Sequence, residues 1–139
     1  MIGINNLTTN LIDEEFLKKI AQKVLEGEKK NNSDLSIALI GQGRMRELNK
    51  KYRGKNKVTD VLSFPDKEMG LGEIVICLRE VKKNAKKFKS TFEKELIVCL
   101  IHGILHLFGY DHEVSEEKAK TMEEKQNYYL KYFLKNEKS

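Results

Sequence analysis

The sequence contains little that would cross-link the chain or hold it in a membrane. Its two cysteines, Cys77 and Cys99, form no CxxC pair, so we expect free thiols in a reducing compartment. The amino-terminal segment MIGINNLTTN lacks a positive region followed by an apolar run, and no apolar run approaches the roughly 20 residues that span a bilayer. We therefore predict a cytoplasmic protein without membrane association.

Linkers, low-complexity segments and internal repeats are also absent. The chain has 139 residues, 40% of them hydrophobic, and a chain of this length removes roughly two thirds of its unfolded surface from water. We expect a single domain over residues 1–139 whose core forms without a metal or a disulfide. A metal ion bound by such a chain would therefore serve its function.

The charge balance is basic. Lys and Arg number 26 against 21 Asp and Glu, which gives a net charge of +5. This balance favours polyanionic partners because cationic side chains release counterions from phosphates. Many proteins are as basic without binding nucleic acid, so composition alone leaves the partner open.

Hydrophobic periodicity predicts a mixture of helices and short strands. Helices are expected from Asp13 to near Gly27, over residues 45–52, 81–88 and 91–107, and from Ser115 to Phe133. Strands are expected over residues 36–40, 59–65 and 72–78, with the single proline, Pro65, ending the second. The pattern predicts an α+β or α/β domain built on a small sheet, and of the two we favour an α+β fold in which a small mixed sheet packs with four to five helices.

All three histidines lie in the segment HGILHLFGYDH, residues 102–112. Residues four apart in a helix lie about 40° apart, so His102 and His106 project from one side. Gly109 can adopt a positive φ and turn the chain so that His112 returns to them. One such histidine alone would be read as a hydrogen-bonded core residue, but three imidazoles with a fourth position open are typical of catalytic zinc. We predict one metal ion per chain, held by these three histidines; imidazole also suits nickel, copper and iron, and we prefer zinc because of its availability.

The neighbours of the histidines leave two interpretations open. Glu95 and Cys99 continue the same helical stripe and could support the metal ligands, or they could be a helix-dipole carboxylate and a small buried filler. Asp111 could orient a histidine or form the turn after Gly109.

The H-x-x-x-H-x-x-G-x-x-H spacing is similar to that of metzincin proteases, in which a glutamate directly after the first histidine is the general base. Gly103 occupies that position here. Without this carboxylate, peptide hydrolysis lacks its proton acceptor. The spacing therefore favours a metzincin-like metal site without favouring a protease.

The longer string HGILHLFGYDH, preceded by LNKKYRGKNKVTDVLSFP and GEIVIC, resembles the YbeY family of metal-dependent endoribonucleases over roughly residues 45–112. The resemblance implies a single-domain α+β fold with zinc on His102, His106 and His112. It also implies cleavage of single-stranded RNA in 16S rRNA 3′-end maturation and ribosome quality control, with rRNA and ribosomal subunits as partners. The functional arginine of the family matches Arg53. We expect no small-molecule cofactor.

Residue chemistry supports an RNA substrate. The guanidinium of Arg53 presents a planar fork that can clamp a phosphodiester and offset charge in the transition state, although by chemistry alone Arg53 could equally be an ordinary surface arginine. Together with the family resemblance, this chemistry leads us to assign Arg53 a catalytic role. Five lysines could guide the RNA backbone: Lys55, Lys82, Lys83, Lys86 and Lys87. For the four lysines of residues 82–87, an exposed helix face is an alternative explanation. Most Phe and Tyr residues occupy core-like positions, so no aromatic platform for stacking is evident.

Two other functions remain alternatives: a zinc metalloprotease-like hydrolase, and a non-catalytic ribosome-binding factor in which the metal only stabilises the fold. The nucleophile is also open. Attack by the ribose 2′-hydroxyl would leave a 2′,3′-cyclic phosphate, whereas attack by metal-bound water would not.

Overall fold

The computed structural model describes residues 1–66, 70–110 and 115–137. Strands and helices alternate over most of the chain before the two final helices. In chain order the elements are β1 (Ile2–Asn6), α1 (Glu14–Gly27), β2 (Leu35–Ile40), α2 (Gln42–Arg53), β3 (Val61–Pro65), β4 (Gly72–Cys77), α3 (Leu78–Lys87), α4 (Phe92–Leu107) and α5 (Glu116–Glu137). The structure confirms the predicted α+β class.

The four strands form one mixed sheet in the order β1-β2-β4-β3. β1, β2 and β4 run parallel, and β3 pairs antiparallel with β4 at one edge. The register places Ile37 of β2 between Ile4 of β1 and Ile74 of β4. These isoleucines lie on the face of the sheet that the main core covers.

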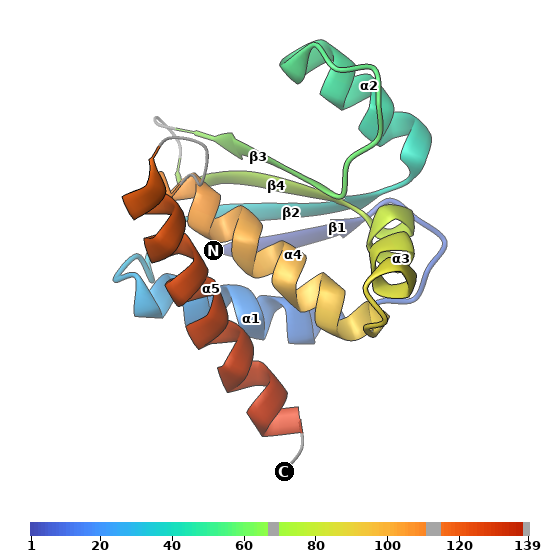
Figure 1. The fold of residues 1–139 in the computed structure, drawn as a ribbon. Coiled ribbons are helices and arrows are strands. Elements are labelled where there is room, and N and C mark those ends of the chain that lie inside the picture. The colour runs from blue at the N-terminus through green and yellow to red at the C-terminus, as the bar shows by residue number, and fades with distance from the viewer. Residues whose placement is uncertain (67–69, 111–114, 138–139) are drawn as a thin grey trace.

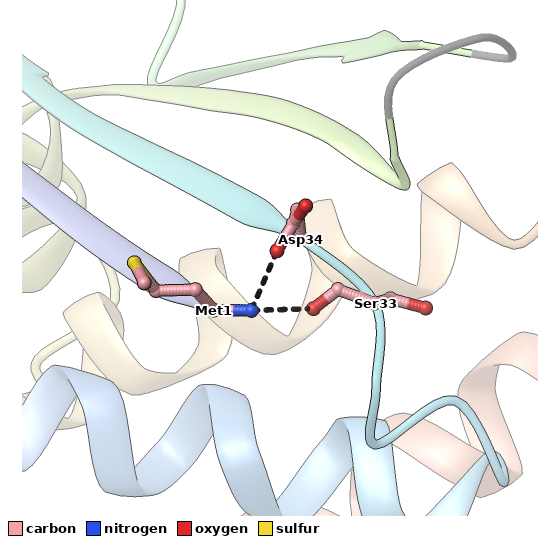
Figure 2. Close-up of polar contacts among 3 residues, drawn as sticks. All are labelled: Met1, Ser33 and Asp34. Carbon is pink, nitrogen blue, oxygen red and sulfur yellow. Dashed lines mark hydrogen bonds and ion pairs between the residues drawn. The ribbon is translucent and has the colours of Figure 1, made fainter.

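Strand β1 was not predicted from the sequence. Its alternation of half-buried and exposed residues covers only five positions, so the signal is short. Pairing with β2 defines it. The Met1 amine donates to Ser33 O at 3.2 Å and to Asp34 Oδ1 at 2.7 Å (Figure 2). Leu35 N donates to Met1 O at 2.9 Å. These contacts depend on residues more than thirty positions away, which local periodicity cannot show.

Helices cover the two faces of the sheet unequally. Figure 1 shows α1, α4 and α5 on one face and α2 alone on the other. The main core lies between the sheet and α1, α4 and α5, and a smaller apolar cluster lies under α2, where Met45 packs with Leu62 and Val75. Helix α4 packs against α1, α3, α5 and the sheet, which explains why it is apolar on most sides.

The predicted helix starts agree closely for α1, α4 and α5, and α5 continues past Phe133 to Glu137. Asp13 accepts a hydrogen bond from Phe16 N at 3.1 Å, Thr91 caps α4 through Lys94 N at 3.1 Å, and Ser115 Oγ accepts from Lys118 N at 3.1 Å. Helix α3 begins earlier than predicted, at Leu78, because β4 passes directly into it without a turn. Within the described ranges, none of the helices has the length and apolar character needed to cross a bilayer.

Candidate active site

Helix α4 carries His102 and His106 one turn apart, as their spacing predicts. Their ring centroids lie 6.3 Å apart with an angle of 36° between the planes, and both side chains are half-buried. A zinc–nitrogen bond is about 2 Å long, so two rings at this separation can reach one ion between them. The two imidazoles therefore fit the predicted metal.

The third predicted ligand, His112, lies outside the described residues, as does Asp111. The chain leaves α4 through Gly109, whose φ of 88° is the positive value expected for the turn. In the part of the chain that the structure describes, no three His, Cys, Asp or Glu side chains are placed to hold a metal. The three-histidine zinc site stays a prediction.

Both histidines open onto a cavity of about 270 Å³, which we call the Arg53 cavity. Its walls come from the end of α2, the loop that follows, β3 and α4; the lining residues are Asn49, Arg53, Lys55, Lys57, Thr59, Asp60, Val61, Leu62, Ser63, His102 and His106. Arg53, singled out by the family resemblance, thus shares a cavity with histidines that are distant in sequence. Cationic donors and imidazoles line one space, which suits a phosphodiester.

The five lysines divide into two groups. Lys55 lines the Arg53 cavity. The other four lie on α3, away from it. Lys82 Nζ donates to Asn10 Oδ1 at 3.0 Å, and Lys83 Nζ lies 3.6 Å from Glu80 Oε1.

Two buried polar side chains hold the walls of the cavity in place. Asn49, 3% exposed, donates through Nδ2 to Lys57 O at 3.0 Å and so fixes the loop after α2. Ser63, 8% exposed, donates through Oγ to Gly103 O at 3.0 Å and ties β3 to α4. Since buried polar groups are costly unless they are hydrogen-bonded, both contacts stabilise the site. Neither was predicted, although a buried Ser inside an apolar strand is a signal of a tertiary partner.

Gln126 of α5 is a further residue that the sequence did not single out. Its Oε1 lies 3.0 Å from His102 Nδ1. With the amide oxygen as acceptor, Nδ1 carries the proton and the Nε2 lone pair is left for a metal. Gln126 can therefore set the tautomer and ring orientation of a predicted ligand.

Gly103 is required for the packing of α4. A Cβ built on it would lie 3.0 Å from Ile74 Cγ2 and 3.3 Å from Val61 Cγ2, so α4 approaches the sheet closely at this residue. A side chain at this position would point into the sheet rather than into the Arg53 cavity. The glutamate of the metzincin motif has no place here.

Cys99 behaves as a buried packing residue. Burial, strengthened by the charge and hydrogen bond of Asp60, raises the pKa of the Cys99 thiol well above its usual value. The protonated thiol lies 3.5 Å from Asp60 Oδ2, which Asn84 Nδ2 also approaches at 3.3 Å. Burial also raises the pKa of Cys77, and both cysteines are free, as predicted.

Comparison with known proteins gives a consistent result. The family model described as "Endoribonuclease YbeY" matches residues 3–134. Three relatives of that name are similar to this chain: one from Thermotoga neapolitana, 46% identical over 119 residues (84% of this chain, 80% of the relative); one from a Sulfurihydrogenibium species, 47% over 117 residues (80% and 77%); and one from Petrotoga mobilis, 43% over 136 residues (96% and 94%).

A solved structure is similar as well. The solution structure of a Thermotoga maritima protein superposes with a TM-score of 0.72 at 39% identity. The match covers 94% of this chain and 87% of that protein.

Proposed function

Because the chain belongs to the YbeY family of endoribonucleases, we propose that it is a zinc-dependent enzyme that cuts single-stranded RNA. We propose further that it acts in 16S rRNA 3′-end maturation and ribosome quality control, with rRNA and ribosomal subunits as partners. The observation that carries the proposal is the Arg53 cavity, where a guanidinium and two imidazoles line one space. A reaction on ribosomal subunits would take place in the cytoplasm.

Each residue at or near the Arg53 cavity would have a distinct role in the reaction. Arg53 would clamp the scissile phosphodiester and offset the negative charge that grows in the transition state. His102, His106 and His112 would hold a zinc ion, which supplies Lewis-acid polarisation of a phosphodiester oxygen when bound. Gln126 would keep the His102 proton on Nδ1, and Lys55 would contact the neighbouring RNA backbone.

Cleavage of a 3′-extended 16S rRNA fragment tests this assignment. Zinc-loaded wild type should cut the RNA, a chelator should stop it and added zinc should restore it. Arg53→Ala should lower kcat by about 10²–10³-fold, the typical loss when one donor to a developing oxyanion is removed. His106→Ala should lose both zinc and turnover. Arg46→Ala is the matched control, since Arg46 is exposed on the same helix and does not line the cavity.

The alternatives give different results. Equal cutting by all variants would indicate a contaminating nuclease. RNA binding without cutting, combined with a lower melting temperature for His106→Ala, would favour the ribosome-binding factor. Zinc-dependent cutting of denatured protein would favour the metalloprotease-like hydrolase. The close packing of Gly103 argues against that alternative, because it leaves no room for the glutamate of the protease motif. If RNA is cut, a 2′,3′-cyclic phosphate on the product would identify the 2′-hydroxyl as nucleophile.

A further inference from the structure

A second cavity shares part of its lining, including His102, with the Arg53 cavity. It has a volume of about 190 Å³ and lies where α3 packs against α4; we call it the α3–α4 cavity. Asp60, Val61 and His102 line both cavities. A water molecule takes a share of roughly 30 Å³ in the liquid, so the α3–α4 cavity holds several waters or one flat ring. A group bound in it would lie next to a phosphodiester bound at Arg53.

The apolar walls of the α3–α4 cavity include an exposed aromatic ring. Val81 and Val98 line its interior, and Phe88 lines it while remaining 60% exposed at the end of α3. Lys87 Nζ lies 5.5 Å from the centroid of the Phe88 ring, close enough to reach a nearby phosphate instead. Exposed aromatic rings flanked by cations are the usual platform for single-stranded nucleic acid bases. Phe88 is therefore an exposed ring at the edge of a cavity, a feature that the sequence did not make evident.

The polar walls of the same cavity offer acceptors. Glu95 is half-buried, and its carboxylate makes no hydrogen bond or ion pair with any residue in the described ranges. The Asp60 carboxylate, by contrast, already faces Cys99 Sγ and Asn84 Nδ2. Glu95 lies in the first turn of α4, where the helix dipole favours its negative charge, and its oxygens are left to accept from a ligand that brings N–H groups.

Among the four RNA bases, guanine fits this set of walls best. Its N1–H and 2-amino groups are two adjacent donors, which the two oxygens of one carboxylate can accept together. Adenine and cytosine present a ring-nitrogen acceptor beside their amino group, and uracil presents two carbonyl oxygens beside its single N–H. Each of these would place a lone pair against the Glu95 carboxylate.

We propose that the α3–α4 cavity binds a guanine base of the RNA, at a nucleotide next to the scissile phosphate. Glu95 accepts hydrogen bonds from N1–H and the 2-amino group, and the base stacks on Phe88. Lys86 and Lys87, at the end of α3, contact the phosphates of that nucleotide. This inference rests on the proposed RNA cleavage at Arg53, and it makes Glu95 a residue that determines specificity.

Cleavage of short RNAs with one mapped cut site tests the inference. The nucleotide on each side of that site is replaced in turn by G, A, C, U and inosine, which is guanosine without its 2-amino group. A good bidentate contact to a base is worth about 1–3 kcal/mol of discrimination, so wild type should prefer G by about 5- to 150-fold in kcat/KM at one of the two positions. Inosine should lose much of this advantage, mainly through KM.

Matched variants separate specificity from general damage. Glu95→Gln should cut guanosine and inosine substrates within about twofold of each other. Glu93→Gln, an exposed carboxylate two residues earlier on α4, should keep the wild-type preference. Phe88→Ala should raise KM for every base, whereas Tyr128→Ala, an equally exposed aromatic on α5, should change nothing. Equal wild-type rates for guanosine and inosine substrates, or an unchanged preference in Glu95→Gln, would overturn the inference.

A binding measurement on the wild-type protein keeps the test independent of cleavage. Guanosine 5′-monophosphate should shift the NMR methyl signals of Val81 and Val98 at lower concentration than inosine or uridine 5′-monophosphate does. If the protein cuts no RNA but shows this order, the proposed function fails and the guanine site stands. If the protein cuts RNA and the three nucleotides act alike, the guanine site fails and the proposed function stands.

Discussion

The hydrogen bond between His102 and Gln126 links the candidate metal site to α5 at the scale of single residues. The 3.0 Å contact joins a ring nitrogen of α4 to an amide oxygen 24 residues later in the chain. A partner of this kind raises the basicity of a ligating imidazole and fixes its ring. Gln126 therefore contributes to the site without lining the Arg53 cavity.

Gln126→Ala should weaken zinc binding by about 10–100-fold, the range typical for removal of a partner behind a metal ligand. Gln126→Glu should bind zinc at least as well as wild type, because a carboxylate accepts the same proton. Competition with a chromogenic chelator measures both affinities. Gln22→Ala serves as control. Among the described residues, the Gln22 side chain hydrogen-bonds only to Glu26, which lies on the same helix. Unchanged zinc affinity in Gln126→Ala would rule out the positioning role.

Helix α5 is joined to α1 by a buried carboxylate. Glu28, whose side chain is 6% exposed, directly follows α1 and accepts hydrogen bonds from Tyr129 OH at 2.6 Å and from Lys125 Nζ at 3.1 Å. Gly27 makes room for this arrangement, because a Cβ there would overlap the Tyr129 ring. The predicted end of α1 near Gly27 is confirmed: the chain turns at Lys29, whose φ of 61° is left-handed, and Lys30 N donates to Leu25 O at 2.7 Å.

The Glu28 hydrogen bonds give stability a defined pH dependence. Burial alone would raise the pKa of Glu28, but the hydrogen bonds from Tyr129 and Lys125 and the charge of Lys125 outweigh it and hold the pKa below its usual value. The contribution to stability is therefore full above the unfolded carboxylate pKa of about 4.3 and is lost as pH falls through the lower pKa of the folded protein. Acid should loosen α5 from α1.

Glu28→Gln should lower the free energy of unfolding by about 2 kcal/mol at pH 7, because the variant cannot form hydrogen bonds to a charged group at this position. The difference between wild type and variant should shrink as pH falls below the unfolded carboxylate pKa of about 4.3, because the unfolded wild-type chain takes up a proton there before the folded protein does. Urea unfolding at pH 7 and pH 3 measures both values. Glu123→Gln, at an exposed position of α5, should be close to wild type at both. A difference that stays constant from pH 7 to pH 3 would contradict this account.

The basic charge of the whole molecule predicts salt-sensitive RNA binding. The protein has a net charge of +5. Each RNA phosphate that it binds releases counterions, so the logarithm of the affinity for a single strand falls with the logarithm of the salt concentration, with a slope of about 0.7 per bound phosphate. Helix α3 carries four lysines, and the last of them, Lys87, precedes Phe88, which lines the α3–α4 cavity. We expect these lysines to bind phosphates of the RNA.

The variant replaces four α3 lysines by Gln: Lys82, Lys83, Lys86 and Lys87. The salt slope of its RNA affinity should be smaller than that of wild type by up to about 3, because each phosphate that is no longer bound lowers the slope by about 0.7. Fluorescence anisotropy with metal removed measures binding without cleavage. The matched control replaces four lysines of α1 and the loop after it, Lys18, Lys19, Lys29 and Lys30. Equal slopes for the two variants would mean that only net charge matters and that the α3 lysines have no special place.

The local sequence pattern was sufficient to predict those elements whose signals all lie within one segment. Helix α4 has a continuous apolar period, a threonine cap and a glycine turn within itself, and the His102–His106 pair follows from helix geometry alone. Strand β1 was missed because pairing with β2 defines it. Arg53 was assigned through family resemblance rather than from its spacing.

The α+β class, the main helices, the paired histidines and membership of a ribonuclease family all follow from the sequence alone. Periodicity, caps and motif spacing carry them, and these are properties of neighbouring residues. The strand order, the cavity that Arg53 shares with the histidines, and the roles of Gln126, Ser63 and Gly103 required the folded molecule. Each of these depends on segments that are distant in the chain, because packing and hydrogen bonding in three dimensions select which distant segments meet.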